Sequence, residues 1–314
     1  MQDFDYYVIF NERAGTASAQ GVTADALRGM FEDAGLRCHI DARSDIDLGQ
    51  RVADAVASPA DILVAAGGDG TITALAEALT GTSKSLAILP LGTVNALAKD
   101  LNIPLEVRQA VQALANGQPQ LIDVGEVNGR TFLHKVVVGV IPAVAAGREF
   151  IRDRRDLGAK IGFLRYFMRR LQRAKRMAVL IRRPDGETRV ERVQAIAVAS
   201  NSYDEGLGQF FSRSSLDKGT LTLYILRHLT PGDVLRLTVA MLLGRWRNDD
   251  ALSIESVDAV TITTHKELLK VMFDGEVETL RTPLEFSIRA KALSVIVQPN
   301  AAVVEALNEN TAPV

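Results

Sequence analysis

The sequence predicts an α/β protein in which a parallel-sheet domain is followed by a β-sandwich domain. Apolar runs of strand length alternate with helical patterns from Phe4 to about Asp123, as in a parallel sheet covered by helices on both faces. After Asp123-Val124-Gly125 the pattern changes to many short strands separated by turn signals, which is typical of a β-sandwich. With 314 residues and 47% apolar content, the chain can bury one or two full cores.

The first half is predicted to alternate strands with helices, because short apolar runs are followed by segments with a helical period. The expected order is strand Tyr6–Phe10, helix Thr23–Ala34, strand Arg37–Asp41, helix Leu48–Ala57, strand Ile62–Ala66, helix Ile72–Leu79, strand Leu86–Leu89, helix Asn95–Leu101 and helix Val107–Asn116.

The second half is predicted to be rich in hairpins. Residues 125–132 carry Asn128-Gly129 between two short runs, and Asn-Gly is a strong signal for a two-residue hairpin turn. The other expected strands are Met177–Arg182, Val190–Ala199, Thr220–Leu226, Ser256–Thr263, Leu268–Phe273, Leu284–Ile288 and Ala292–Val297.

Composition excludes several classes of protein. The net charge of −2 argues against a general nucleic-acid binder, and a single cysteine, Cys38, excludes a disulfide framework. The first residues are acidic and polar, unlike a signal peptide. The longest apolar-rich stretch, Leu235–Leu243, is too short to span a bilayer and is followed by Arg245 and Arg247. We therefore expect a soluble cytoplasmic protein.

The most informative motif is Gly67-Gly68-Asp69-Gly70-Thr71, which follows an apolar run and precedes a predicted helix. Glycine lets the backbone approach a phosphate chain closely, and the helix N-terminus would face the anion. A carboxylate fits beside phosphate when a divalent cation or an acceptor hydroxyl lies between them. The motif therefore favours phosphoryl transfer from a nucleotide over an ordinary strand-to-helix turn. It has neither the lysine of a Walker A loop nor the GxGxxG spacing.

Two other loops repeat this arrangement. The strand ending at Pro90 runs into Leu91-Gly92-Thr93-Val94-Asn95, and the first strand runs into Asn11-Glu12-Arg13-Ala14-Gly15. The carboxyl ends of parallel strands are where open α/β sheets bind ligands. We therefore expect the three loops to form one site.

Together with Asp274-Gly275-Glu276, these motifs resemble the diacylglycerol kinase catalytic family, which includes bacterial soluble lipid kinases and the sphingosine and ceramide kinases. The resemblance spans about residues 5–300, and Gly67–Thr71 alone is shared with NAD kinases. It implies a nucleotide-binding α/β domain (residues 1–124), a lipid-substrate β-sandwich domain (residues 125–298) and an active site in the cleft between them. Residues 299–314 would return to the first domain and end in disorder.

The resemblance also implies the site residues and the cofactors, ATP and Mg²⁺. Asp274 or Glu276 would be the base, Asp69 is the alternative base, and Asp69 is favoured as the organiser of magnesium or of the acceptor hydroxyl. The expected ATP-binding residues are Asn11, Ala14, Gly15, Gly67, Gly68, Asp69, Gly70, Thr71, Gly92, Thr93 and Asn95.

The chain departs from the family pattern at three positions, with Glu12 where proline is usual, Ala96 where aspartate is common and Lys218 beside Asp217 where a second aspartate is usual. Lys218 makes the family's structural metal at Asp217 doubtful, because its ammonium group could take the place of the cation, with Asp123 and Asp217 as partners. The equally weighted alternative is an ordinary lysine in a surface turn. These departures motivate one alternative, a catalytically weak regulator that binds lipid or nucleotide.

Residues 148–183 indicate contact with an anionic membrane surface, because they contain 13 Arg or Lys and 3 acidic residues. Within them Arg165, Arg169 and Arg173 lie on one side of a predicted amphipathic helix. A helix that covers the β-sandwich is the equally weighted alternative. Phe210 and Phe211 would add to a lipid pocket or belong to the core.

We conclude from the sequence that the chain is an ATP- and magnesium-dependent kinase of a lipid hydroxyl. The acceptor would be diacylglycerol, ceramide, a sphingoid base or a related lipid alcohol. The enzyme would be cytoplasmic and peripheral at the inner face of the membrane, without a nucleic-acid partner. The sequence does not predict its oligomeric state. The second enzyme hypothesis is an NAD kinase, which would need no lipid surface.

Overall fold

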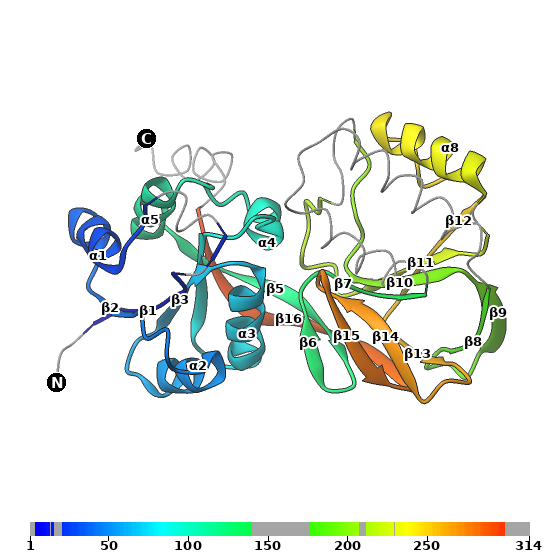
Figure 1. Cartoon of the computed structure of the whole chain (residues 1–314), viewed down its shortest axis with the longest axis horizontal. Helices are drawn as coiled ribbons and strands as arrows, with labels where there is room; N and C mark the ends of the chain where they lie inside the picture. The colour runs from blue at the N-terminus through cyan, green and yellow to red at the C-terminus, as the bar shows by residue number, and fades with distance from the viewer. Residues whose placement is uncertain are drawn as a thin grey trace, which may run out of the picture. The chain divides into compact units, whose positions relative to one another are not determined.

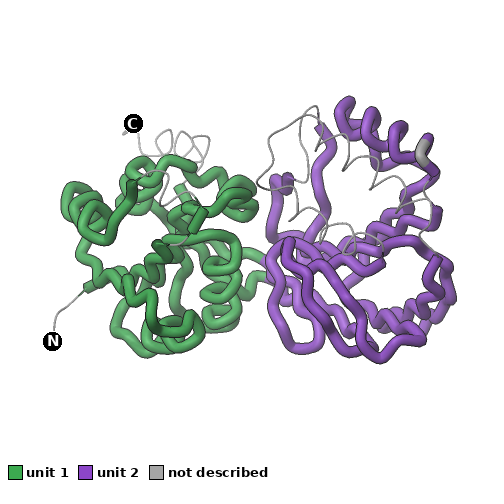
Figure 2. The backbone as a smooth tube through the Cα atoms, in the orientation of Figure 1, with its two compact units in different colours: residues 1–122, 291–314 green, residues 123–290 purple. Residues whose placement is uncertain are grey.

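The computed structural model describes residues 4–12, 14–15, 21–139, 176–206, 212–228 and 230–298. The chain divides into two compact units, one made of residues 1–122 and 291–314 and the other of residues 123–290 (Figure 2). The last strand belongs to both units, whereas the sequence analysis assigned it wholly to the second domain.

The first unit is built on a parallel sheet (Figure 1). Its strands are β1 (Tyr6–Phe10), β2 (Cys38–Asp41), β3 (Ile62–Gly67) and β4 (Ser85–Pro90), in the order β2-β1-β3-β4. All three pairings are parallel, and Ser294 and Val295 of the last strand add a further parallel pairing to β4. The predicted parallel sheet is confirmed.

The helices of this unit cover both faces of the sheet. Helices α1 (Ala24–Asp33) and α5 (Val107–Ala115) share one apolar core with alternate residues of β1 and β3. Helices α2 (Leu48–Ala57) and α3 (Asp69–Leu79) pack together, α2 against β1 and α3 against β3 and β4. The short helix α4 (Ala96–Asp100) follows β4 and leads toward α5.

The second unit is a sandwich of two antiparallel layers, which confirms the predicted fold class. One layer is a six-stranded sheet in the order β12-β11-β10-β7-β14-β15. The other contains β16, β13, β8 and β9 in that order, and β5 and β6 form a hairpin. The strands are β5 (Gln118–Val127), β6 (Arg130–Phe132), β7 (Lys135–Gly139), β8 (Met177–Arg182), β9 (Thr188–Val193), β10 (Ala195–Ser200), β11 (Leu221–Leu226), β12 (Leu252–Val257), β13 (Ala259–Thr263), β14 (Leu268–Phe273), β15 (Glu276–Arg281) and β16 (Leu284–Val297).

Apolar side chains from the inner faces of the two layers form one core. Val136 and Val138 of β7 meet Val179 and Ile181 of β8 there, and all four are buried. Within each strand these residues alternate with positions on the outer face, as the period of a pleated strand requires.

Several predicted strand boundaries were wrong, for one shared reason. The predicted strand Val190–Ala199 is divided at Gln194 into β9 and β10, which pair in different layers. The predicted strand Ser256–Thr263 is likewise divided at Asp258 into β12 and β13. The chain passes from one layer to the other at both points, and a single polar residue within an apolar run does not reveal such a corner. In contrast, the two strands expected within 284–297 form one continuous strand, β16.

The sequence analysis missed β7, β15 and a helix of the second unit. Helix α8 (Pro231–Leu242) begins at a capping box, in which the Thr230 side chain accepts from the Asp233 N–H and the Asp233 carboxylate accepts from the Thr230 N–H. Its outer face is unusually apolar, which is why the segment was noticed only as an apolar stretch. Within the described residues no helix is long and apolar enough to cross a membrane.

Candidate active site

The Gly67–Thr71 loop presents the N-terminus of a helix. Strand β3 ends at Gly67 and α3 begins at Asp69, with Gly68 as an N-cap that makes no side-chain hydrogen bond. A Cβ atom on Gly67 would lie 2.5 Å from Oγ1 of Thr71, so this position tolerates only glycine. Because the N-cap is glycine, no capping side chain occupies the backbone N–H groups in the first turn of α3. Such uncapped N–H donors are what an anion-binding site requires.

Asn95 closes the second loop. It has a positive φ of 51°, its Oδ1 accepts from the Gly92 N–H at 2.8 Å, and its Nδ2 donates to the Gly92 carbonyl oxygen at 2.8 Å. A Cβ atom on Gly92 would lie 2.8 Å from the Cα atom of Gly68. The second loop therefore packs directly, backbone against backbone, on the first.

Asp69 ties these two loops together. Its carboxylate accepts from the backbone N–H of Asn95 at 3.2 Å and from that of Ala96 at 2.9 Å, at the start of α4. Although Ala96 lacks the carboxylate common in the family, its backbone is held by Asp69. Each oxygen of Asp69 accepts one of these bonds, which leaves lone pairs on both for a further partner.

The N-terminal loop joins the same cluster. The Asn11 N–H donates to the Ala66 carbonyl oxygen at 2.9 Å, and Asn11 Nδ2 lies 3.5 Å from Oγ1 of Thr71. A Cβ atom on Gly15 would lie 2.8 Å from Oγ1 of Thr93. The structure thus brings residues 11, 12, 14 and 15 together with loops 67–71 and 92–95 at the carboxyl ends of β1, β3 and β4.

Arg51, which the sequence analysis missed, supports this cluster from α2. Its guanidinium donates to the carbonyl oxygens of Phe10 at 2.9 Å and Asp41 at 2.5 Å, and it lies 3.2 Å from the Asp41 carboxylate. Burial acts to raise the pKa of Asp41, but hydrogen bonds from Arg43 and the charge of Arg51 lower it to about 2. An arginine on one face of a helix gave no sequence signal, because its partners come from two other strands.

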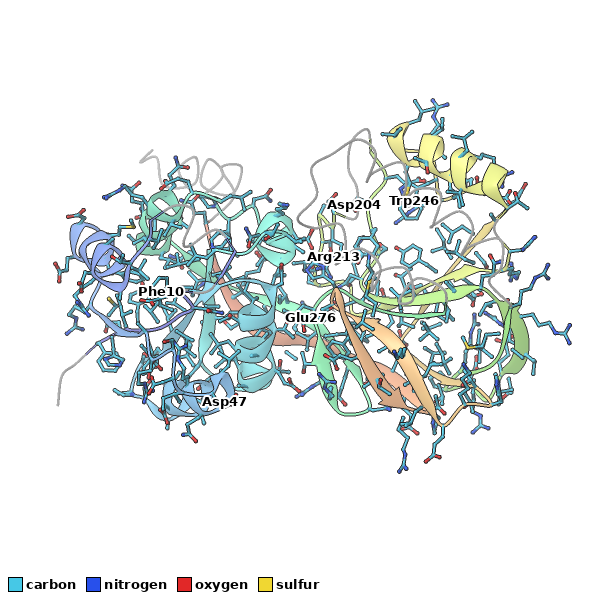
Figure 3. All side chains as sticks on the ribbon, viewed as in Figure 1. Phe10, Asp47, Asp204, Arg213, Trp246 and Glu276 are labelled. Carbon is cyan, nitrogen blue, oxygen red and sulfur yellow. The ribbon has the colours of Figure 1, made fainter. Side chains whose placement is uncertain are left out.

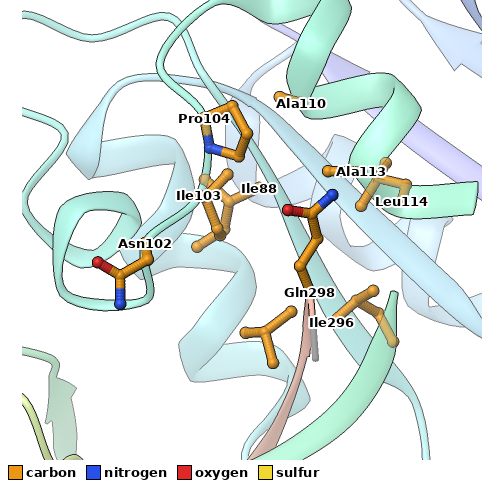
Figure 4. Close-up of a pocket in the computed structure, with 10 residues that line it drawn as sticks. Ile88, Asn102, Ile103, Pro104, Ala110, Ala113, Leu114, Ile296 and Gln298 are labelled. Carbon is orange, nitrogen blue, oxygen red and sulfur yellow. The ribbon is translucent and has the colours of Figure 1, made fainter. Parts of the chain in front are cut away.

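The described residues of the first unit line a pocket beside the N-terminal loop and a second, smaller one. One, of about 260 Å³, is lined by Phe10, Asn11, Glu12, Ser44, Ile46, Leu48 and Arg51 and opens beside the N-terminal loop. The other lies between α5 and the ends of β4 and β16 (Figure 4) and holds about 10 Å³, little more than the room for one water. Of these two pockets, the first has room for part of a nucleotide.

The Asp274-Gly275-Glu276 turn joins β14 to β15 in the second unit. Asp274 has a positive φ of 45°, and its carboxylate accepts from the backbone N–H groups of Leu133 at 2.6 Å and of His134 and Lys135 at 2.9 Å each. Burial raises the pKa of the Asp274 carboxyl, and these donors only partly offset the rise. Glu276 is exposed and its side chain makes no hydrogen bond or ion pair within the described residues. Asp274 is thus an anchor of the turn, and Glu276 is its accessible carboxylate.

A buried arginine underlies this turn. Arg213 is 2% exposed and donates to the carbonyl oxygens of Leu133 at 2.7 Å and Ser200 at 2.9 Å, and to Nδ1 of His134 at 2.9 Å. Because a guanidinium only donates, Nδ1 of His134 accepts, and burial beside Arg213 holds the pKa of His134 well below its ordinary value. Arg213 and Glu276 are labelled in Figure 3.

Lys135 lies opposite Asp274 in the same part of the second unit. Its carbonyl oxygen accepts from the Asp274 N–H at 3.0 Å, and its Nζ lies 5.0 Å from the ring centroid of Tyr203. Burial and the charge of Arg213 lower the pKa of Lys135 to about 8. The sequence carried no signal for Arg213, His134 or Lys135, because strand pairing brings them to the turn.

Lys218 does not approach Asp123 or Asp217 as a substitute cation. It is exposed, and its Nζ lies 3.2 Å from Oγ of Ser202. The buried Asp123 accepts from the Gly219 N–H at 2.6 Å, and Asp217 accepts from Oγ of Ser215. Asp123 therefore holds the backbone of this loop. Among the residues that the structure describes, no group of three or more His, Cys, Asp or Glu could hold a metal ion.

Comparison with known proteins gives the family. The family model for the diacylglycerol kinase catalytic domain matches residues 5–127, and that for the YegS C-terminal NAD kinase beta sandwich-like domain matches residues 147–297. A Pseudomonas aeruginosa protein named "Probable lipid kinase YegS-like" is 34% identical over 256 residues, which cover 80% of this chain and 81% of the relative. The chain belongs to the diacylglycerol kinase catalytic family.

Other members of the family agree over most of their length. The diacylglycerol kinase of Bacillus subtilis is 25% identical over 279 residues, covering 86% of this chain and 88% of the relative. The solved structure of a diacylglycerol kinase from Bacillus anthracis shares the fold, with a TM-score of 0.66 at 20% identity over 95% of this chain and 99% of that one. The chain is therefore an enzyme, a phosphotransferase of the lipid kinase family.

Some predicted residues lie outside the described part of the chain. They are Arg165, Arg169 and Arg173, expected to contact the membrane, Phe210 and Phe211, expected in a lipid pocket or in the core, and the tail from residue 299. The remaining predicted residues form the loop cluster of the first unit, the Asp274–Glu276 turn and the Asp217–Lys218 loop.

Proposed function

We propose that this lipid kinase transfers the γ-phosphate of ATP, with Mg²⁺, to the hydroxyl group of a lipid. The observation that carries the proposal is the cluster of three loops around Asp69 and the N-terminus of α3. Phosphoryl transfer is catalysed by positioning and charge stabilisation, and such a cluster supplies both to a phosphate chain.

In this proposal the phosphates lie on the first turn of α3, between Gly68, Gly70 and Thr93. Gly70 and Thr93 are exposed, so their backbone and hydroxyl groups are accessible to a ligand. The pocket beside Asn11 is open to the nucleoside part. Glu12 lines this pocket and adds a negative charge, which magnesium would offset.

Asp69 is the carboxylate of the cluster that suits Mg²⁺. Magnesium is usually held by one or two carboxylates together with substrate phosphates and water, so the absence of a larger acidic group among the described residues is compatible with it. The lone pairs that the Asn95 and Ala96 N–H groups leave unused fit such a role. Bound magnesium would neutralise charge on the phosphates.

Glu276 is the better base of the two carboxylates in the Asp274–Glu276 turn. A general base must reach the proton that it removes, and Glu276 is exposed whereas Asp274 is committed to three backbone donors. Asp274 holds the turn that presents Glu276. We propose that this turn and the Asp69 cluster serve the same reaction.

The acceptor is proposed to be diacylglycerol, ceramide, a sphingoid base or another lipid alcohol, because the relatives are named as diacylglycerol and lipid kinases. Such substrates lie in a bilayer, so we propose that the enzyme works in the cytoplasm at the inner face of the membrane.

The test is transfer of labelled γ-phosphate from ATP and magnesium to a panel of lipids in mixed detergent micelles. The panel contains diacylglycerol, ceramide, sphingosine and phosphatidylglycerol, and NAD is assayed alongside. Glu276→Gln should lower kcat by at least about a hundredfold with little change in ATP affinity, as loss of a general base does. Glu285→Gln, which removes another exposed carboxylate of the second unit, is the matched control and should be active.

Each outcome separates the hypotheses. Lipid labelled by the wild type and by Glu285→Gln, but not by Glu276→Gln, supports the proposal and identifies the acceptor. Label in NAD alone would identify an NAD kinase. No label in any acceptor, with ATP still bound, would favour a regulator that has kept the fold. Glu276→Gln with a normal rate would overturn the assignment of the base.

A further inference from the structure

Helix α8 of the second unit carries an exposed apolar face. Leu235, Val239, Leu242 and Leu243 are 67%, 45%, 50% and 57% exposed. Their spacing of four, seven and eight residues from Leu235 places them on one face of the helix. A soluble protein usually turns such a face toward its core, and an exposed apolar patch of this kind marks an interaction surface.

The opposite face of α8 is already packed. Ala240 and Met241 lie against a cluster that contains Tyr203, Tyr224 and the buried Trp246, which is labelled in Figure 3. The exposed apolar residues are therefore not the face with which α8 packs on its own core. They form a second apolar face on a helix whose core face is satisfied.

The helix is also held by polar contacts at its start and near its middle. The capping box of Thr230 and Asp233 fixes its start, and Arg236 donates to both carboxylate oxygens of Asp249, at 2.7 and 2.8 Å. These bonds neutralise Arg236 and Asp249 beside the apolar face. A helix fixed in this way can present its outer face without rearrangement on binding.

We propose that this face of α8 docks on the surface of a lipid bilayer. The proposal rests on the proposed function, because a kinase of bilayer lipids must meet its substrate at the membrane surface. An amphipathic helix binds there by burying its apolar face at the boundary of headgroups and acyl chains. Arg245, exposed directly beyond the leucines, adds a positive charge that favours anionic headgroups.

The area of the face argues against a second copy of the chain as its occupant. Four half-exposed side chains offer on the order of 400 Å² of apolar surface, about half of the roughly 800 Å² that each partner buries in a stable interface. A bilayer needs no matching shape, so a small convex helix face suffices there.

The docking face is connected to the Asp274–Glu276 turn within the same unit. The rings of Trp246 and Tyr224 lie 5.9 Å apart, and those of Tyr224 and Tyr203 lie 5.7 Å apart. Tyr203 in turn lies 5.0 Å from Nζ of Lys135, whose N–H donates to Asp274. Packed aromatic rings therefore link the helix to the turn that presents the proposed base.

The experiment is co-sedimentation of the full chain with vesicles of phosphatidylcholine containing a quarter of phosphatidylglycerol. The test variant is Leu235→Gln/Val239→Gln/Leu242→Gln, because glutamine removes apolar surface and is still a good helix former. The control is Val190→Gln/Leu268→Gln, which removes two exposed apolar side chains elsewhere in the second unit, 68% and 61% exposed. We expect the α8 variant to lose about tenfold or more in vesicle partitioning, since binding scales with buried apolar area, and the control to stay within about twofold.

Kinase assays separate this inference from the proposed function. The α8 variant should phosphorylate lipid normally in detergent micelles but slowly in vesicles. If the wild type phosphorylated no lipid in micelles, the proposed function would be refuted. The docking inference would still be tested, because vesicle binding is measured without turnover. Vesicle binding of the α8 variant equal to the wild type would overturn the docking inference. A second result would also overturn it. This is a dimer of the wild type, seen by light scattering, that the α8 variant does not form although the variant still binds vesicles.

Discussion

Gly92→Ala tests whether close backbone packing builds the nucleotide site. The new Cβ atom would lie 2.7 Å from Oδ1 of Asn95 and 2.8 Å from Cα of Gly68, closer than such atoms approach in folded proteins. Relief requires the Gly68 backbone to move or the two hydrogen bonds between Gly92 and Asn95 to break. Two hydrogen bonds at about 1 kcal/mol each, with overpacking of about 1–3 kcal/mol, give a cost of roughly 3–5 kcal/mol.

The cost should appear in both stability and nucleotide binding. We expect Tm to fall by about 5–10 °C and the Kd of Mg-ATP to rise at least about tenfold, measured by differential scanning fluorimetry and isothermal titration calorimetry. The matched control is Gly29→Ala in α1, where the added Cβ meets no atom within 4 Å and alanine should stabilise the helix by about 0.5–1 kcal/mol. Wild-type Tm and ATP affinity in Gly92→Ala would refute the reasoning.

Three further substitutions test the loop cluster around Asp69, its support by Arg51, and the surroundings of the Asp274–Glu276 turn. Asp69→Asn keeps one of the two hydrogen bonds to the start of α4 but turns an amide N–H toward the other backbone donor. We therefore expect kcat/KM for lipid phosphorylation to fall at least about tenfold. A wild-type value would contradict the role of Asp69. Lys135 has a pKa of about 8 when folded and about 10.4 when unfolded, so the unfolded chain binds more protons between these values and the free energy of unfolding should rise with pH there. Urea unfolding at pH 8 and pH 10 should show this rise in the wild type and a smaller one in Lys135→Met, and equal slopes would argue against the shift. Arg51→Met leaves the buried Asp41 with one cation fewer and should cost about 3 kcal/mol. Because the folded pKa of Asp41 is about 2, below its unfolded value, its stabilisation is present at neutral pH and lost as pH falls, so acid unfolding of Arg51→Met should begin at higher pH than in the wild type.

Local sequence was sufficient for β1 to β4 and the helices between them because each of these elements is marked by its own residues. The strand predicted at Ile62–Ala66 is Ile62–Gly67 in the structure, one residue longer, and helix Leu48–Ala57 has the predicted bounds. A parallel sheet buried on both faces leaves short apolar runs between amphipathic helices, and these signals lie within one segment of chain. The same holds for the hairpin turn at Asn128-Gly129, which connects β5 to β6 as predicted.

The second unit was less predictable because its boundaries depend on pairing between distant strands. Gln194 and Asp258 interrupt apolar runs at points where the chain changes layer, and neither is a residue that by itself ends a strand. In the same way, the Asp274-Gly275-Glu276 motif was found in the sequence, but the different environments of its two carboxylates were not. They arise from the backbone of residues 133–135, which the pairing of β7 with β14 brings to the turn.

The sequence by itself determined the α/β and β-sandwich order, the family and the loops that gather at the carboxyl ends of the parallel strands. Only the tertiary structure decided that Asp69 holds the start of α4, that Arg213 lies buried under the Asp274–Glu276 turn, and that α8 turns leucines outward. The physical reason is the range of the interactions. Helix periodicity, turn geometry and glycine loops are set by neighbours along the chain, whereas burial, charge pairing and exposure are set by residues that folding brings together.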